Sequence, residues 1–272
     1  MQPVLFEKIV HNEELVPSIF KLVFKSEYIA QNAKPGQFVN IKCCEGINTI
    51  LRRPISICDV DRDNNYVTIV YQKRGKGTEY LSRAREGDTL NVIGPLGRSF
   101  EMSDRYKNIA VVGGGIGIFP LLFLLKESKT MKKTAFIGFR NKENYVLIDE
   151  FERYANDLFI STDDGSFGYK GFITDLFENG IANEKFDIIY TCGPEAMMEK
   201  VVKASYQAGI PCQVSLEQRM GCGIGACLAC VCRIKIISES EKENSNKSWH
   251  YKRVCKDGPV FWGHEWYEWG QA

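Results

Sequence analysis

The sequence predicts a β-barrel domain, then an α/β domain built on a parallel sheet, then a small cysteine-rich segment at the C-terminal end. Three observations lead to this fold class. Short β-like runs separated by turn signals fill residues 1–100, strands and helices alternate over residues 101–216, and closely spaced cysteines occupy residues 217–272. The chain has 272 residues, of which 44% are hydrophobic, and this is enough for about two packed domains.

The first 100 residues contain short runs rich in β-branched and aromatic side chains. Turn signals such as Pro35-Gly36 and Gly94-Pro95 separate these runs. The runs predict strands at residues 18–25, 37–42, 55–60, 67–72 and 89–93. Many short strands at this spacing are typical of a barrel or a sandwich.

After Arg105 the pattern changes to strand, helix, strand. Strands are expected at residues 108–112, 134–139, 158–162, 187–191 and 212–216, and helices at residues 118–127, 173–178 and 195–207. This alternation predicts a parallel sheet with helices on both faces.

The turn after the first of these strands is rich in glycine. Gly113, Gly114, Gly115 and Gly117 stand between a strand and a helix, where backbone N–H groups and the helix N-terminus can bind a pyrophosphate. The dinucleotide motif would place a further glycine at position 118, but this chain has Ile118. A tight packing turn without a ligand remains the alternative.

A second loop, Cys192-Gly193-Pro194, follows another expected strand at the edge of the sheet where open α/β sheets bind ligands. This loop, the glycine turn and the loop at residues 162–166 all follow expected strands, and together they are expected to converge on a nucleotide. Cys192 could lie against a nicotinamide ring, although a single cysteine here is also a common core residue. Arg140 stands where an acidic residue would indicate NAD, so the preference for NAD or NADP is not readable from this position.

Cys222, Cys227, Cys230 and Cys255 follow the order C-x4-C-x2-C…C, which is the spacing of plant-type [2Fe-2S] centres. Small residues between the first three let the backbone wrap closely and direct N–H groups at the cluster sulfurs. Cys232 follows two residues after Cys230 and is expected in a strand, not as a ligand. Structural zinc and unligated thiols are the alternatives.

A nicotinamide delivers two electrons together as hydride, whereas a [2Fe-2S] centre takes one at a time. Flavin can connect the two, which suggests a flavin in the N-terminal β domain. The candidate flavin-binding residues come from three segments: Arg53, Pro54, Ile55, Ser56, Val70, Tyr71, Gln72, Gly77 and Thr78. Arg53 could pair with a phosphate, Ser56 could bind the isoalloxazine edge, and the amides of Gly77 and Thr78 could form a phosphate nest.

Charge gives no case for nucleic acid or an anionic membrane as partner, because 35 basic and 34 acidic residues leave a net charge of +1. The N-terminal residues carry no basic-then-apolar signal, and the apolar run at residues 116–125 is too short to span a bilayer. We therefore expect a cytoplasmic protein. The polar stretch at residues 238–248 is expected to be a mobile hairpin tip.

These motifs resemble those of one family. They are Pro35-Gly-Gln-Phe-Val39, Arg53-Pro-Ile-Ser56, Gly75-Lys-Gly-Thr78, Gly113-Gly-Gly-Ile-Gly117, Cys192-Gly-Pro194, the run from Glu217 to Cys232, and Lys252-Arg-Val-Cys-Lys-Asp-Gly-Pro-Val-Phe261. Over nearly its whole length the chain resembles the electron-transfer subunits of type B dihydroorotate dehydrogenases, within the ferredoxin-NADP reductase superfamily.

The resemblance implies FAD in the barrel, NAD at the α/β domain and one [2Fe-2S] cluster on Cys222, Cys227, Cys230 and Cys255. It also implies a partner, an FMN-containing subunit that oxidises dihydroorotate to orotate in pyrimidine synthesis, in a heterotetramer of two plus two subunits. The three segments leave no room for a second flavin barrel, which agrees with a separate partner. The aromatic tail, residues 261–269, could anchor that partner or simply form a C-terminal strand packed over the cluster.

Two departures keep other hypotheses open. The stretch between Cys230 and Cys255 is long for the family, which leaves Cys232 as a substitute ligand. The ending Trp262-Gly-His264 is similar to that of small subunits of NADH-dependent ferredoxin-NADP oxidoreductases and sulfide dehydrogenases. A non-catalytic zinc or iron–sulfur sensing module is the hypothesis from another class, and it predicts no bound flavin.

Overall fold

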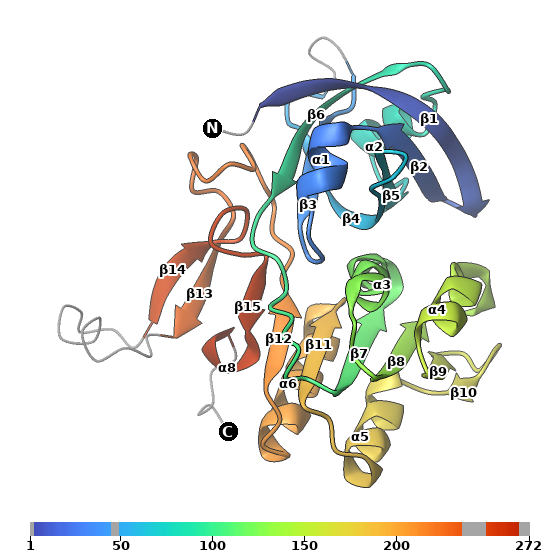
Figure 1. Ribbon diagram of the computed structural model, residues 1–272, viewed down its shortest axis with the longest axis vertical. Coiled ribbons are helices and arrows are strands. Elements are labelled where there is room, and N and C mark those ends of the chain that lie inside the picture. The colour runs from blue at the N-terminus through green and yellow to red at the C-terminus, as the bar shows by residue number, and fades with distance from the viewer. Residues whose placement is uncertain (1–2, 45–48, 236–248, 267–272) are drawn as a thin grey trace.

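The computed structural model describes residues 3–44, 49–235 and 249–266. Figure 1 shows a barrel in one half, a sheet with helices on both faces in the other, and a small hairpin beside both. The predicted fold class is confirmed. Among the described residues, no helix combines the length and the apolar character that crossing a bilayer requires.

The barrel is closed by six antiparallel strands in the order β1-β2-β5-β4-β3-β6. Their bounds are β1 Val4–Val16, β2 Ile19–Lys25, β3 Phe38–Lys42, β4 Arg53–Asp61, β5 Tyr66–Gln72 and β6 Thr89–Leu96. The five predicted strands correspond to β2 to β6, each within a few residues. β1 was not predicted, because charged residues interrupt its apolar ones and its outer face is mostly solvent-exposed.

Two short helices of the barrel domain, α1 (Glu27–Asn32) and α2 (Lys76–Leu81), were also not predicted. Ser26 caps α1 by accepting a hydrogen bond from the backbone N–H of Ile29. Gly77 and Thr78, expected to form a nest in a loop, instead lie in the first turn of α2. Their backbone N–H groups therefore belong to a helix N-terminus, where such groups lack intrahelical partners.

The second half is a seven-stranded sheet in the order β10-β9-β8-β7-β11-β12-β15. Its strands are β7 Asn108–Gly114, β8 Lys132–Phe139, β9 Asp157–Thr162, β10 Tyr169–Lys170, β11 Ile188–Cys192, β12 Cys212–Ser215 and β15 Val260–Trp262. All neighbours are parallel except β12 and β15, which are antiparallel. The last strand thus comes from the cysteine-rich segment.

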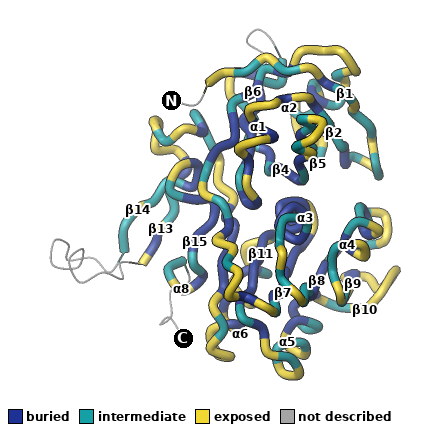
Figure 2. Tube along the Cα trace, viewed as in Figure 1, coloured by how far each residue is buried: buried dark blue, intermediate teal, exposed yellow. Residues whose placement is uncertain are grey.

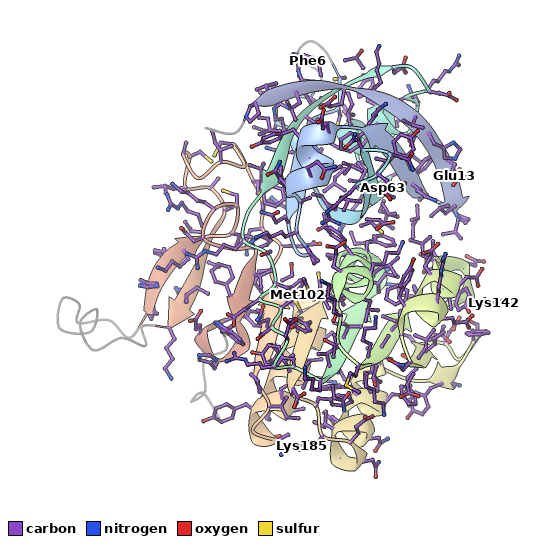
Figure 3. All side chains as sticks on the ribbon, in the orientation of Figure 1. Phe6, Glu13, Asp63, Met102, Lys142 and Lys185 are labelled. Carbon is purple, nitrogen blue, oxygen red and sulfur yellow. The ribbon has the colours of Figure 1, made fainter. Side chains whose placement is uncertain are left out.

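Helices cover both faces of this sheet, as expected. One face packs against α3 (Ile118–Glu127) and α4 (Ile148–Tyr154), and the other against α5 (Ile173–Asn183) and α6 (Glu195–Gln207). The short 3-10 turns η1 (Gly115–Gly117) and η2 (Lys142–Asn144) follow β7 and β8. Figure 3 shows Lys142 on the side of the molecule that carries α4.

The helix α3 lies between the barrel and the sheet and is buried over residues 118–125 (Figure 2). Phe123 belongs to the barrel core, whereas Leu121 belongs to the core of the sheet domain. At the end of α3, Lys126 Nζ lies 2.8 Å from Asp59 Oδ2 on β4 and 3.0 Å from Glu150 Oε2 on α4. This helix therefore fixes the barrel against the sheet.

The cysteine-rich segment adds a hairpin of β13 (Val231–Lys235) and β14 (Trp249–Arg253), followed by β15 and by α8 (Gly263–Trp266). Its predicted mobile tip at 238–248 and the end of the aromatic tail lie outside the described residues. Phe261 is buried in β15, which agrees with the alternative of a C-terminal strand. The segment also joins the linker after β6, where Figure 3 labels Met102, because Arg98 N donates to Gly258 O at 2.6 Å.

Candidate functional site

A cavity of about 230 Å³ opens between the barrel and the sheet domain. Its barrel wall comes from neighbouring strands β4 and β5 and from α2. Eight of the nine flavin candidates line it: Arg53, Pro54, Ile55, Ser56, Val70, Tyr71, Gln72 and Thr78. Since β4 and β5 are hydrogen-bonded neighbours, residues far apart in sequence are brought to one surface.

The ninth candidate, Gly77, lies directly against Arg53. A Cβ atom at Gly77 would stand 2.8 Å from Arg53 Nε and 3.1 Å from Nη2, so the absence of a side chain lets the guanidinium lie over the N-terminal turn of α2. Arg53 Nη1 donates to the carbonyl oxygen of Leu51 at 2.6 Å. A fixed cation beside free helical N–H groups is suited to a phosphate.

Several lining residues were not predicted. They are Phe38, Arg74, Ile116, Phe119, Ser215, Leu216, Glu217, Gln218, Met220 and Pro259. Phe119 gave no signal, because in sequence it is one apolar residue of a buried helix. The run from Ser215 to Gln218 carried a usable signal, since it follows the carboxyl end of a sheet strand. Burial raises the pKa of Tyr71, whose hydroxyl donates to Asn12 Oδ1 at 3.3 Å, so the phenol stays protonated.

The two glycine loops of the sheet domain lie side by side, because β7 and β11 are adjacent parallel strands. A Cβ atom at Gly117 would stand 2.5 Å from Cys192 O, and one at Gly193 would stand 2.9 Å from Gly114 N. Pro194 contacts the same place, 3.0 Å from the Cβ position of Gly114. The backbones of the residues predicted to bind the nucleotide therefore form one continuous surface.

Cys192 connects this surface to the cavity, whose wall it lines. Burial raises the pKa of its thiol to about 12, so the side chain is neutral and compact at physiological pH. Gly115 has a φ of +55° and nothing within 4 Å of its Cβ position, so its backbone faces open space. The site thus combines the open backbone at Gly115 with a cavity whose wall includes the small, uncharged side chain of Cys192.

Gly117→Ala tests the contact between the two loops. Because Gly117 has an ordinary φ of −68°, the added methyl group acts only through its clash with the backbone of Cys192 and Gly193. We expect the KM for NADH to rise at least several-fold while bound FAD is retained, measured by flavin reduction kinetics. Gly209→Asn is the control, because its φ of +69° suits asparagine and its Cβ position is open. An unchanged KM in Gly117→Ala would contradict the assignment.

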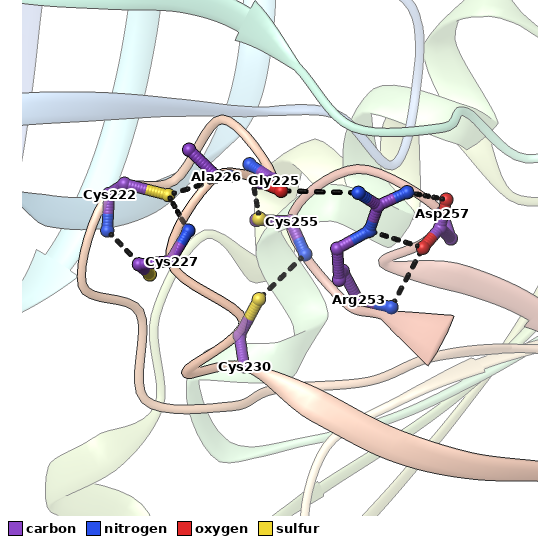
Figure 4. Close-up of polar contacts among 8 residues, drawn as sticks. All are labelled: Cys222, Gly225, Ala226, Cys227, Cys230, Arg253, Cys255 and Asp257. Carbon is purple, nitrogen blue, oxygen red and sulfur yellow. Dashed lines mark hydrogen bonds and ion pairs between the residues drawn. The ribbon is translucent and has the colours of Figure 1, made fainter. Parts of the chain in front are cut away.

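The four candidate cluster ligands gather around one loop (Figure 4). Backbone N–H groups point at their sulfurs: Gly225 N donates to Cys255 Sγ at 3.1 Å, Ala226 N to Cys222 Sγ at 3.3 Å, and Cys255 N to Cys230 Sγ at 3.4 Å. Such N–H groups stabilise sulfur-centred negative charge. A loop of this kind is what an iron–sulfur cluster needs.

The electrostatic result differs between the candidate ligands: burial raises the pKa of Cys255 to about 12, whereas the pKa of Cys222 is lowered. Desolvation alone would raise the pKa of the Cys222 thiol, but hydrogen bonds from the N–H groups of Ile224, Cys227 and Ala226 and from the Cys227 side chain outweigh it and lower that pKa to about 6. The thiolate, which binds metal, is therefore the favoured form at neutral pH. Cys230 and Cys255 are buried, whereas Cys227 is exposed, so one side of the loop faces solvent.

Within the described ranges, no three His, Cys, Asp or Glu side chains converge closely enough to hold one metal ion. A [2Fe-2S] cluster distributes its four ligands over two irons, so they need not converge on one point. Cys232 lies in β13, as expected, opposite Lys252 of β14.

An arginine clamp holds the cysteine loop to the end of β14. Arg253 Nε and Nη2 donate to Asp257 Oδ2 and Oδ1 at 2.8 and 3.0 Å, and Nη1 donates to Gly225 O at 3.1 Å (Figure 4). The bond from Arg253 lowers the pKa of Asp257 to about 2, so the carboxylate stays ionised. The clamp fixes Gly225, whose own N–H reaches Cys255.

Comparisons with known proteins agree with this geometry. A family model for the iron-sulfur cluster binding domain of dihydroorotate dehydrogenase B matches residues 217–266, and one for the oxidoreductase NAD-binding domain matches residues 111–203. The dihydroorotate dehydrogenase B (NAD(+)) electron transfer subunit of Caldanaerobacter subterraneus subsp. tengcongensis is 39% identical over 258 residues, which cover 95% of this chain and 96% of that protein. The corresponding subunit of Bacillus mycoides is 41% identical over 259 residues, covering 93% and 94%.

Solved structures show the same fold. One from an NADH-dependent reduced ferredoxin-NADP oxidoreductase has a TM-score of 0.81 at 32% identity, covering 98% of this chain and 92% of that one. A ferredoxin NADP+ reductase from Neisseria gonorrhoeae with bound FAD and NADP has a TM-score of 0.64 at 15% identity, covering 76% and 92%. The second likeness concerns the fold alone.

The barrel, the parallel sheet and the cysteine loop define a flavin- and iron–sulfur-dependent oxidoreductase of the ferredoxin-NADP reductase superfamily. Sequence identity of about 40% to the two subunits described above, over nearly the whole chain, shows which family within this superfamily is meant. The chain belongs to the family of electron-transfer subunits of NAD-linked dihydroorotate dehydrogenase B.

Proposed function

We propose that this chain carries electrons from a dihydroorotate-oxidising partner subunit, through a [2Fe-2S] cluster and FAD, to NAD. The observation that carries the proposal is the cavity between the two domains. The predicted flavin strands, the Cys192 loop and the segment that leads into the cysteine loop all line that one cavity. Three kinds of site therefore meet at one place.

When bound, FAD exchanges a hydride with nicotinamide and single electrons with an iron–sulfur centre. The chain's own residues bind the cofactors and orient them toward each other. We assign Arg53 with the N–H groups of Gly77 and Thr78 to the FAD phosphates, and Ser56 to the isoalloxazine edge. The remaining flavin contacts are Pro54, Ile55, Val70, Tyr71 and Gln72.

For the nucleotide, we assign the backbone of Gly113, Gly114, Gly115 and Gly117 to the pyrophosphate. Cys192, Gly193 and Pro194 form the wall of the nucleotide site that faces the glycine turn. The neutral thiol of Cys192 allows close approach of nicotinamide to flavin. The cluster ligands are Cys222, Cys227, Cys230 and Cys255. No residue is assigned as a general base, because hydride exchange between these cofactors needs none from the chain.

The family implies a catalytic dihydroorotate dehydrogenase partner subunit. We further propose that this partner contains FMN and that two subunits of each kind form a heterotetramer. The exposed Cys227 supports docking of a partner beside the cysteine loop, because it leaves one side of the loop open to another protein. All ten cysteines are free of disulfides, which agrees with a reducing, cytoplasmic setting.

The test is anaerobic purification of the full chain with its native partner, followed by iron, sulfide and flavin analysis and absorption spectra. We expect two irons, two sulfides and one FAD per chain. Dihydroorotate should bleach the flavin absorbance, and NAD should restore it. A colourless zinc protein without flavin would refute the proposal in favour of a sensing module.

A second candidate function rests on the solved structure at 32% identity, which comes from an NADH-dependent reduced ferredoxin-NADP oxidoreductase. In this alternative the chain is the small subunit of a ferredoxin-linked NAD(P)H oxidoreductase. Cofactors that ignore dihydroorotate but respond to NADPH or ferredoxin would select it.

A further inference from the structure

Asn40 joins the flavin barrel to the cysteine loop. It lies in β3 with 1% of its surface exposed, and its Nδ2 donates to the carbonyl oxygen of Cys222 at 3.1 Å. The two residues are 182 positions apart in sequence. A barrel side chain thus reaches the backbone of a predicted cluster ligand.

The cysteine loop is shaped to accept this side chain. Gly223 has a φ of +73°, and a Cβ atom there would stand 2.3 Å from Asn40 Nδ2. Any side chain at position 223 would therefore be strained and would push the amide away. The close approach of the loop to the barrel depends on the absence of a side chain at 223.

The other end of the Asn40 amide is unpaired in the described structure. Its Oδ1 is buried without a hydrogen-bond partner. An unpaired buried acceptor is destabilising, whereas an apolar residue at this position would carry no such cost. The donor half of the amide, which binds Cys222 O, is therefore the feature that distinguishes asparagine here.

Asn40 also stands one strand away from the flavin cavity. In the ladder between β3 and β4 it is paired with Pro54, which lines that cavity. On the side of the cysteine loop, Met220 lines the same cavity two residues before Cys222. The bond between Asn40 and Cys222 therefore closes a short ring of contacts between the cavity and the loop.

We propose that Asn40 is a positioning residue that holds the Cys222 loop at a fixed separation from the flavin cavity and so sets the rate of electron transfer between FAD and the cluster. This inference rests on the proposed function. The assay with NADH runs the step opposite to the proposed direction: one electron would leave reduced FAD and enter the oxidised cluster, and the flavin would release a proton to solvent.

The test uses Asn40→Asp and Asn40→Ala in the full chain loaded with FAD and cluster. Asn40→Asp keeps the shape of the side chain but replaces the donor by an acceptor. Asn108→Ala is the matched control, because Asn108 also has a buried unpaired Oδ1, and its Nδ2 donates to Lys185 O and to Glu184 Oε1, both at 2.9 Å. It lies at the start of β7, the opposite end of that strand from Gly113.

NADH is mixed with each protein in a stopped-flow instrument, and flavin and cluster absorbance are followed separately. We expect flavin reduction to proceed at the wild-type rate and cluster reduction to slow at least roughly twofold in both Asn40 variants, because a small displacement of the reacting groups lowers the rate steeply. Asn108→Ala should match the wild type. Iron, sulfide and FAD contents should stay unchanged, and EPR should show a weaker magnetic interaction between the flavin and the reduced cluster.

Three outcomes overturn the inference: cluster reduction at the wild-type rate in loaded Asn40 variants, equal slowing in Asn108→Ala, or loss of the cluster from folded Asn40→Asp and Asn40→Ala. The last would assign Asn40 to cluster assembly. Failure of NADH to reduce the cluster in the wild-type protein would instead contradict the proposed function, so the two failures are distinguishable.

Discussion

A Cys227→Ser variant is expected to lose its iron–sulfur cluster and with it all electron exchange with the partner subunit. Serine replaces a soft thiolate by a poorly matched oxygen, and iron–sulfur clusters are held by thiolates. Because Cys227 is exposed, the substitution removes little packing. Iron analysis and visible absorbance should show near-complete loss of the cluster, while NADH still reduces FAD at nearly the wild-type rate.

Cys232→Ser is the matched control for this experiment. Cys232 is partly buried, lies in β13 and is the remaining cysteine closest in sequence to the predicted ligands. We expect this variant to keep its iron and its spectrum. If Cys227→Ser retained the normal spectrum and Cys232→Ser lost it, the ligand set would be wrong and the substitute ligand correct.

An Arg53→Ala variant is expected to release FAD on dilution. The guanidinium edge that faces Gly77 would no longer be available to a phosphate, and a charge-assisted hydrogen bond is worth about 1.5–3 kcal/mol. The Kd for FAD should therefore rise roughly ten- to hundredfold. Fluorescence titration of the apoprotein with FAD measures this change, and Arg53→Lys should recover part of the affinity.

Arg62→Ala distinguishes a specific loss of FAD from general destabilisation. Arg62 belongs to the same domain, and its Nη1 pairs with Glu127 Oε1 of α3 at 2.6 Å, outside the cavity. The control is expected to retain wild-type FAD affinity even if its Tm falls. Unchanged FAD affinity in Arg53→Ala would remove Arg53 from the proposed site.

Local sequence patterns predicted most of the fold, because apolar periodicity and turn residues act over a few positions. The strands β2 to β6 and the helix α6 are examples, and the bounds predicted for α6 agree with the structure. β1 was not predicted, because this long barrel strand with an exposed outer face mixes charged and apolar residues without a clear period. The helices α1 and α2 are six residues each, too short for a helical period to be visible.

The candidate site was predictable where its residues are contiguous in sequence. The glycine turn after β7 and the cysteine spacing are motifs of this kind. The cavity wall could not be read in full, because Phe119 and Pro259 reach it only through packing of α3 and of the cysteine-rich segment. Asn40 was invisible for the same reason, since its partner Cys222 lies at the other end of the chain.

The antiparallel pairing of β15 with β12 means that the cysteine-rich segment also covers the edge of the parallel sheet. Gln213, Val214 and Ser215 of β12 are paired with β15, which forms the edge of the sheet on that side. Truncation after β12 would leave a row of backbone N–H and C=O groups open to pairing with other chains, which favours aggregation. A cluster-free reductase is therefore better obtained by replacing cysteines than by shortening the chain, because the cofactor segment also shields the sheet from self-association.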